Sequence, residues 1–180
     1  ERELMLLIAG GLVIAIVSFE DDRRELRASF KLLMQIVTVL FLIYNGIILD
    51  LFPIQSLWGY WIDLLLTLVW IVGITNAMNF LDGMDGLAAG VSAIIAGFIG
   101  IVATQTHQPI MGWIAIALVG SCLGFLPYNF KLTGKPASIF LGDTGSAYLG
   151  FTLSTLAVIG DWDSNPIISF SAPVLIFWVL

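Results

Sequence analysis

The chain consists of apolar runs of about the length needed to cross a membrane, separated by short polar segments. This feature constrains the fold most, because a helix that spans a hydrocarbon core of about 30 Å needs roughly 20 apolar residues. The sequence therefore predicts an all-α fold, a polytopic transmembrane helix bundle with about seven spans. The predicted spans comprise residues 4–19, 32–49, 62–80, 87–104, 111–130, 146–160 and 171–180.

The composition excludes several other classes of protein. Of the 180 residues, 59% are apolar and 11% are charged, whereas a soluble domain has roughly 45–50% apolar and about 25% charged residues. The net charge of −6 offers no basic face to nucleic acid, and a single cysteine, Cys122, rules out a disulfide framework or a cysteine-rich zinc site. Residue 1 is not methionine and the last run is short, so we interpret residues 1–180 as a single transmembrane domain within a longer protein.

The cationic residues predict which ends of the spans face the cytoplasm. Six of the seven lie in the first and fifth connections between spans, and Lys and Arg are enriched in cytoplasmic loops. Counting spans places the third connection, residues 81–86, on the same side. Aromatic residues that suit the membrane interface then lie at the outer ends of the spans, namely Trp58, Tyr60, Trp61, Trp113 and Trp162.

Carboxylates are concentrated on the same predicted cytoplasmic side, as Glu20, Asp21, Asp22, Glu25, Asp82, Asp85 and Asp143. Two carboxylates about 6 Å apart repel by roughly 3 kcal/mol at an effective dielectric constant of about 20, and a divalent cation would cancel that repulsion. Magnesium fits best, because it binds a few carboxylates together with substrate phosphates. We therefore predict a site at the membrane surface for a divalent cation and a phosphorylated substrate.

The third connection and the helix end before it carry a polar residue at every third position, as Asn76, Asn79, Asp82 and Asp85. Residues three apart are neighbours on a helix, and two glycines among them allow the backbone to turn sharply and approach a ligand. Alternatively, Asp85 caps the helix that follows, while Asn76 and Asn79 form hydrogen bonds between helices.

The fifth connection places Asp143 between two glycines and shortly before Ser146. An acid in this setting resembles an oxygen-rich cradle for a metal or a phosphate. The alternative is a helix cap formed by Asp143 or Thr144. Phe140, three residues earlier, is positioned either to stack on a nucleotide base or to pack in the core.

The first connection contains the adjacent acids Asp21 and Asp22, the adjacent arginines Arg23 and Arg24, and then Lys31. Such a segment is often a solvated surface whose charges neutralise one another. Cations beside metal-bound acids are also the usual means of holding phosphates, so both interpretations stay open at this point.

Together these motifs resemble those of the polyprenyl-phosphate N-acetylhexosamine-1-phosphate transferases. The matching segments are Asp21-Asp22, then Asn76-x-x-Asn79-x-x-Asp82-Gly83-x-Asp85-Gly86-Leu87, then Phe140-Leu-Gly142-Asp143-x-Gly145-Ser146. The resemblance runs in order across residues 18–150. The family's early spans and its later histidine-containing loop have no counterpart here, so the domain looks truncated at both ends relative to the family. The sequence around the fifth connection is more similar to the branch that uses UDP-N-acetylglucosamine than to the peptidoglycan branch.

The resemblance implies a role for each motif residue. Asp82, Asp85 and Asn79 would line the nucleotide-sugar site, and Lys31 suits a phosphate. Asn129 and Phe140 would lie near the uracil. In full, it implies catalytic roles for Asp21, Asp22, Asp82 and Asp85, metal binding by Asp143, and substrate binding by Lys31, Asn76, Asn79, Asn129 and Phe140.

The resemblance also implies an activity. Family members transfer a sugar-1-phosphate, here N-acetylglucosamine-1-phosphate by preference, from a UDP-N-acetylhexosamine to polyprenyl (undecaprenyl) phosphate. They release UMP, require Mg²⁺ or Mn²⁺, and start the synthesis of cell-envelope glycans such as peptidoglycan and O-antigen. The implied location is the bacterial inner membrane, with several spans and a cytoplasmic active site, and a homodimer is left open.

Two rival functions come from other classes of protein. An ion-coupled transporter would use the carboxylates as a cation or proton path. It would place acids near the middle of the membrane, where the sequence offers only Asp63, close to the outer end of its span. A non-catalytic helix-bundle subunit would need only the small residues that allow close helix packing.

Overall fold

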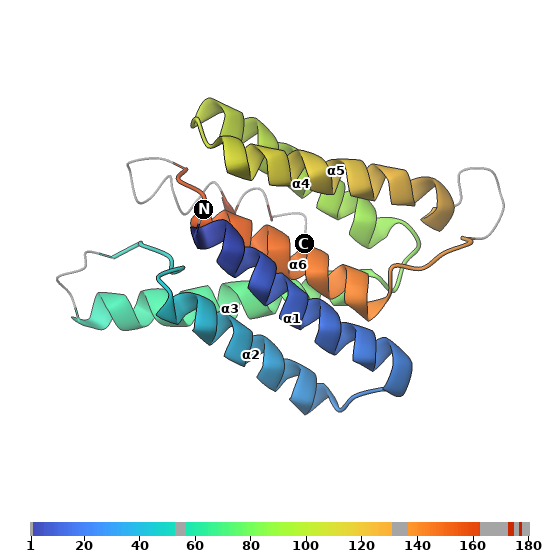
Figure 1. Ribbon diagram of the computed structural model, residues 1–180, viewed down its shortest axis with the longest axis horizontal. Coiled ribbons are helices and arrows are strands. Elements are labelled where there is room, and N and C mark those ends of the chain that lie inside the picture. The colour runs from blue at the N-terminus through green and yellow to red at the C-terminus, as the bar shows by residue number, and fades with distance from the viewer. Residues whose placement is uncertain (1, 53–56, 131–136, 163–172, 175–176, 178–180) are drawn as a thin grey trace.

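The computed structural model shows an all-helical bundle whose helices are joined by mostly short connections (Figure 1). The structure describes residues 2–52, 57–130, 137–162, 173–174 and 177. No strand occurs within these residues, and the prediction of an all-α fold is confirmed. The helices are α1 (Arg2–Arg24), α2 (Ala28–Tyr44), α3 (Leu57–Leu81), α4 (Leu87–Gln105), α5 (Pro109–Asn129) and α6 (Gly142–Ile159).

Among the described residues, four helices are long and apolar enough to cross a membrane, namely α1, α3, α4 and α5. Helix α2 is apolar but has 17 residues, because the predicted span 32–49 leaves the helix at Tyr44 and continues through a turn at Asn45 and Gly46. The chain is a multi-pass membrane protein. The predicted last span, 171–180, lies largely outside the described residues.

The helix boundaries differ from the predicted spans where the charged residues lie. Asp21 and Asp22 belong to the last turns of α1, Lys31 lies in the first turn of α2, and Asp143 lies in the first turn of α6. The sequence placed these residues in connections because their charge was taken to end a span. A helix continues past its apolar stretch when its last turn reaches the membrane surface, where charged side chains are tolerated.

Helix α6 lies at the centre of the bundle, between the α4–α5 pair and helices α1 and α3 (Figure 1). Its polar side chains explain this position, because hydroxyl groups at helix interfaces avoid exposure to lipid. Ser146, Thr152, Ser154 and Thr155 are all buried. Phe151 is also buried and belongs to the apolar core, to which α1, α2, α3 and α4 contribute as well. Asp143, in the first turn of α6, therefore belongs to the central helix of the bundle.

Successive helices run in opposite directions, so the connections α1–α2, α3–α4 and α5–α6 lie at one end of the bundle, on the right in Figure 1. We call this end, where α1, α3 and α5 finish and α2, α4 and α6 begin, the carboxylate end. The predicted grouping of the first, third and fifth connections on one side is therefore confirmed. The connections α2–α3 and α4–α5 lie at the opposite end.

Candidate active site

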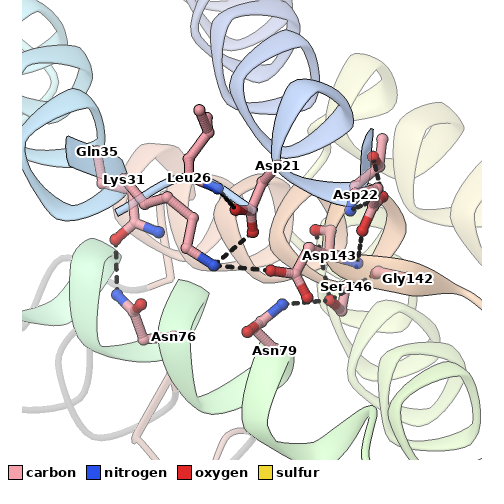
Figure 2. A network of polar contacts seen from close by, with 11 residues as sticks. Asp21, Asp22, Leu26, Lys31, Gln35, Asn76, Asn79, Gly142, Asp143 and Ser146 are labelled. Carbon is pink, nitrogen blue, oxygen red and sulfur yellow. Dashed lines mark hydrogen bonds and ion pairs between the residues drawn. The ribbon is translucent and has the colours of Figure 1, made fainter. Parts of the chain in front are cut away.

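Four helices contribute side chains to one polar cluster at the carboxylate end (Figure 2). Asp21 comes from α1, Lys31 from α2, Asn79 from α3 and Asp143 from α6. These residues are separated by up to 122 positions in the sequence, as 143 − 21 shows. The fold therefore brings together the motifs of the first, third and fifth connections, as the sequence predicted.

The centre of the cluster is the ammonium group of Lys31, which bridges two carboxylates. Its Nζ lies 2.5 Å from Asp21 Oδ2 and 2.9 Å from Asp143 Oδ2. The Asp21 side chain is only 8% exposed, and its other oxygen accepts a hydrogen bond from the Leu26 backbone N–H at 2.7 Å. The sequence predicted a divalent cation between neighbouring acids. In the structure the Lys31 ammonium provides the positive charge between Asp21 and Asp143.

Asn79 is held against α6 through Ser146. The Asn79 amide donates to Ser146 Oγ at 3.0 Å, and Ser146 Oγ donates to the Gly142 carbonyl oxygen at 2.8 Å. Ser146 was not among the predicted site residues. It lies three residues after Asp143 and hence on the same side of a helix, so this spacing was the signal that could have identified it.

The N-terminus of α6 receives two carboxylates from other parts of the chain. Asp22 accepts hydrogen bonds from the backbone N–H groups of Asp143, at 3.0 Å, and Thr144, at 3.1 Å. Asp82 accepts one from the Gly142 N–H. The alternative that Asp143 or Thr144 caps this helix is wrong, because the capping acceptor comes from α1.

The electrostatic state of Asp82 reflects this crowded position. Burial raises the pKa of Asp82 to about 6, and the nearby negative charges of Asp143 and Asp22 act in the same direction. The hydrogen bond from the Gly142 N–H opposes this rise because it favours the carboxylate. The predicted acids of all three connections are thus close enough to influence one another.

Asp85 is exposed and does not cap α4, so that alternative is wrong as well. The residue before α4 is Gly86, which has a φ of +77° and provides no side-chain cap. Its N–H instead donates to Asn129 Oδ1 at 2.8 Å, and Asn129 Nδ2 donates to the Ile139 carbonyl oxygen at 2.9 Å. The buried Asn129 therefore ties the third connection to the fifth.

Two other predicted substrate-binding residues lie in different settings. Phe140 is 75% exposed, so core packing does not account for it and its ring is free to contact a ligand. Asn76 donates to Gln35 Oε1 at 2.6 Å, which confirms the alternative of a hydrogen bond between helices. The substrate-binding roles of Phe140, Asn76, Asn79 and Asn129 stay predictions.

The donor groups around Asp143 are compatible with magnesium. They include carboxylate oxygens and the hydroxyl oxygen of Ser146, and oxygen ligands are those that this hard cation prefers. Within the described part of the chain, no three His, Cys, Asp or Glu side chains are arranged to hold a metal ion. Mg²⁺ commonly takes one or two carboxylates and completes its shell with water and substrate phosphates, so Asp143 with one neighbouring acid is a sufficient protein contribution.

Gly86 provides a test of how the third and fifth connections are joined. We expect Gly86→Ala to lower the free energy of unfolding by about 2–4 kcal/mol, because the positive φ suits glycine and overpacking adds a further cost. An added Cβ would lie 2.6 Å from Phe130 Cδ2. Thermal unfolding in detergent micelles measures the effect. Gly83→Ala is the matched control, because its Cβ would meet only the Phe80 carbonyl oxygen at 3.5 Å, and equal losses in both variants would contradict the prediction.

The fold and the site define a class of protein: a multi-pass membrane helix bundle with carboxylates, a lysine and amides gathered at one end of its helices. Comparison with known proteins then identifies the family. Residues 4–161 match the family described as glycosyl transferase family 4, and the chain belongs to this family.

Relatives in this family carry names consistent with the motif resemblance. The chain is 36% identical to the probable undecaprenyl-phosphate N-acetylglucosaminyl 1-phosphate transferase of Bacillus subtilis (strain 168), over 99% of this chain and 50% of that protein. It is 38% identical to the decaprenyl-phosphate N-acetylglucosaminephosphotransferase of Mycolicibacterium smegmatis, over 82% and 39%. It is also 38% identical to the phospho-N-acetylmuramoyl-pentapeptide-transferase of Synechococcus sp. (strain JA-3-3Ab), over 88% and 46%. The chain spans about half the length of the curated relatives it matches, or less.

Proposed function

We propose that the protein transfers N-acetylhexosamine-1-phosphate from a UDP-sugar to polyprenyl phosphate and releases UMP. The observation that carries this proposal is the convergence of Asp21, Lys31, Asn79 and Asp143 from four helices at one end of the bundle. The names of the relatives given above, two N-acetylglucosamine-phosphate transferases and a phospho-N-acetylmuramoyl-pentapeptide-transferase, support the general reaction. The product would start the synthesis of a cell-envelope glycan.

The reaction joins two anions, so its main barrier is the repulsion between the lipid phosphate and the pyrophosphate of the donor. A lipid phosphate oxygen attacks the phosphorus attached to the sugar, the pyrophosphate P–O bond breaks, and UMP departs with the bonding electrons. Lys31, whose Nζ lies between Asp21 and Asp143, is the cation placed to attract the incoming phosphate. Asp21 or Asp22 accepts the proton of that phosphate.

A covalent version of the reaction uses an aspartate as nucleophile and passes through a phosphorylated protein. The two versions differ in a simple observation. With UDP-sugar alone, the covalent version yields UMP and an aspartate that carries the sugar-1-phosphate, whereas direct attack yields neither until the lipid phosphate is added.

Magnesium, with manganese as an alternative, is the cofactor that this proposal includes, and Asp143 would hold it together with one neighbouring acid. When bound, the ion would neutralise negative charge on the transferring phosphate groups. The chain's own contribution is to orient Asp143, which the hydrogen bonds at the α6 N-terminus and the ion pair with Lys31 achieve.

The preferred donor is UDP-N-acetylglucosamine. The sequence around the fifth connection supports this choice, as do the names of the Bacillus and Mycolicibacterium relatives. The site would face the cytoplasm of a bacterial inner membrane, because the Lys and Arg residues of the first connection lie at the carboxylate end.

The test is UMP release by the full-length natural protein in detergent. With UDP-N-acetylglucosamine, undecaprenyl phosphate and Mg²⁺ present, we expect one UMP per lipid-linked sugar formed. Omitting the lipid, or chelating the metal, is expected to reduce the signal to background. UDP-N-acetylmuramoyl-pentapeptide in place of UDP-N-acetylglucosamine tests the donor. A lack of UMP with every donor would contradict the proposal.

The transporter alternative is weakened by the surroundings of Asp63. This residue is buried near the end of the bundle opposite the carboxylate end, and its two oxygens accept hydrogen bonds from the Leu51 and Phe52 N–H groups, both at 3.3 Å. Asp63 therefore anchors the connection between α2 and α3. The carboxylates of the cluster lie at the other end of the helices, which suits a surface enzyme better than an ion path through the membrane.

A further inference from the structure

Asp22 uses its carboxylate to hold the first turn of α6. Its Oδ1 accepts the Asp143 N–H, and its Oδ2 accepts the Thr144 N–H. The Thr144 hydroxyl also donates to Oδ2, at 2.6 Å. The first N–H groups of a helix have no partner within the helix and carry partial positive charge. A carboxylate from another helix accepts their hydrogen bonds and also neutralises this charge.

Asp21 and Asp22 are adjacent in sequence, but their carboxylates contact different groups. Consecutive residues on an α-helix point about 100° apart, so both side chains cannot face the same group. Figure 2 shows the Asp21 carboxylate turned toward Lys31 and the side chain of Asp143, whereas the Asp22 carboxylate reaches the backbone near Gly142. The two acids therefore have separate tasks.

The backbone of α6 is shaped around the Asp22 carboxylate. Gly142 has a φ of +70°, and a Cβ added there would lie 3.1 Å from Asp22 Oδ2. A side chain at residue 142 would therefore press against the carboxylate as well as strain the backbone. This close approach is a second indication, besides the hydrogen bonds, that α1 and α6 are fitted together at Asp22.

We infer that Asp22 is a positioning residue, which, with Thr144 as its partner, seats the N-terminus of α6 and thereby aims Asp143 at Lys31 and Asn79. The inference rests on the proposed transferase function and deepens it. Three of the roughly four lone-pair positions of the Asp22 carboxylate are used by donors of α6. The proton of the attacking phosphate is therefore accepted by Asp21, which faces the cluster, and Asp22 acts through Asp143.

The first experiment is a double-mutant cycle on UMP release by the full-length protein, with Asp22→Asn and Thr144→Val. A hydrogen bond from Thr144 to a charged group suggests a loss of about tenfold in kcat for Thr144→Val. We expect Asp22→Asn to lower kcat about 100-fold. The double variant should lower kcat no further than Asp22→Asn alone, because both substitutions break the same contact between Asp22 and Thr144. Losses that multiply, to about 1,000-fold, would overturn the inference.

Conservative rescue separates positioning from a general loss of structure. Thr144→Ser keeps the hydroxyl and is expected to retain kcat within about twofold, while Thr144→Val keeps the shape and loses the hydrogen bond. We also expect KM for both substrates to change less than about threefold in Thr144→Val, because the groups that touch substrate are still present. Wild-type kcat in Thr144→Val, or an equal loss in Thr144→Ser, would contradict the role of this contact.

Hydrogen exchange tests the inference without any activity. In Thr144→Val and Asp22→Asn, we expect the Asp143 and Thr144 amides to exchange at least about tenfold faster than in the wild type, with α3 unchanged. Unchanged exchange would overturn the positioning role. If the wild-type protein released no UMP but the exchange result held, the proposed function would fail while the contact between Asp22 and α6 stood. If Asp22→Asn did not fold, the comparison of Thr144→Val with Thr144→Ser would still test the positioning role.

Discussion

Asp143→Asn should reduce UMP release by about 10³-fold or more while leaving the protein folded. In the proposed reaction the Asp143 carboxylate holds the cation that neutralises the transferring phosphates, and such charge stabilisation is worth several kcal/mol in the transition state. The substitution removes that charge with almost no change in shape. The measurement is the rate of UMP release against Mg²⁺ concentration in the full-length protein.

The fold should survive Asp143→Asn because the ion pair with Lys31 is the contact that depends on its charge, and Lys31 has a second carboxylate partner. Lys31 keeps its ion pair with Asp21, and the backbone N–H of residue 143 still donates to Asp22. We expect the unfolding temperature to change little. Asp161→Asn is the matched control, since this exposed residue follows the far end of α6 and is bonded through its backbone to Gln108. Turnover of Asp143→Asn at the wild-type rate would refute the assignment of Asp143.

The class of fold follows directly from the sequence because membrane spans are set by length and polarity. The apolar runs predicted helices, and the number of spans predicted which connections share an end. The sequence alone therefore predicted that Asp82 and Asp143 lie at the same end of the bundle. The run 62–80 corresponds to α3 and the run 111–130 to α5, both within a few residues of the helix ends.

The pairings within the site could not be predicted, because they depend on how each helix is rotated about its axis. Lys31 was expected to bind a substrate phosphate, and nothing in the spacing of the chain shows that it reaches Asp143, 112 residues away. Asn129 was expected near the base of a nucleotide, which stays a prediction, and nothing in the sequence indicates that its amide joins Gly86 to Ile139. Such contacts arise from tertiary packing, which local sequence patterns do not predict.

The different orientations of the Asp21 and Asp22 side chains could have been predicted in part from the sequence. Both were interpreted as one acidic pair within a loop. Had α1 been extended to Arg24, the 100° angle between successive residues would have indicated that only one of the two could face the site. The missing information was the helix boundary, which apolar periodicity alone locates poorly because charged residues continue the helix at the membrane surface.

Lys31→Met should both destabilise the protein and abolish turnover, unlike Asp143→Asn. Removing the ammonium leaves the Asp21 carboxylate, 8% exposed, with one donor among the described residues, the Leu26 N–H, and leaves Asp143 without its counter-ion. Breaking a buried pair by deleting one partner costs about 3–5 kcal/mol. Because the Lys31 side chain is itself 29% exposed, we expect about 2–3 kcal/mol, together with a loss of UMP release of about 10³-fold.

Added Mg²⁺ and a second substitution make this prediction specific to the cluster. If the Lys31 ammonium is the charge that separates the two acids, Mg²⁺ should raise the unfolding temperature of Lys31→Met more than that of the wild type. Adding Asp143→Asn to Lys31→Met should recover part of the lost stability, because one of the two unpaired acids is removed. Arg27→Met, one turn earlier, is the matched control, since Arg27 is exposed and forms no ion pair among the described residues. Equal unfolding temperatures for Lys31→Met and Arg27→Met would show that the bridge between Asp21 and Asp143 contributes nothing to the fold.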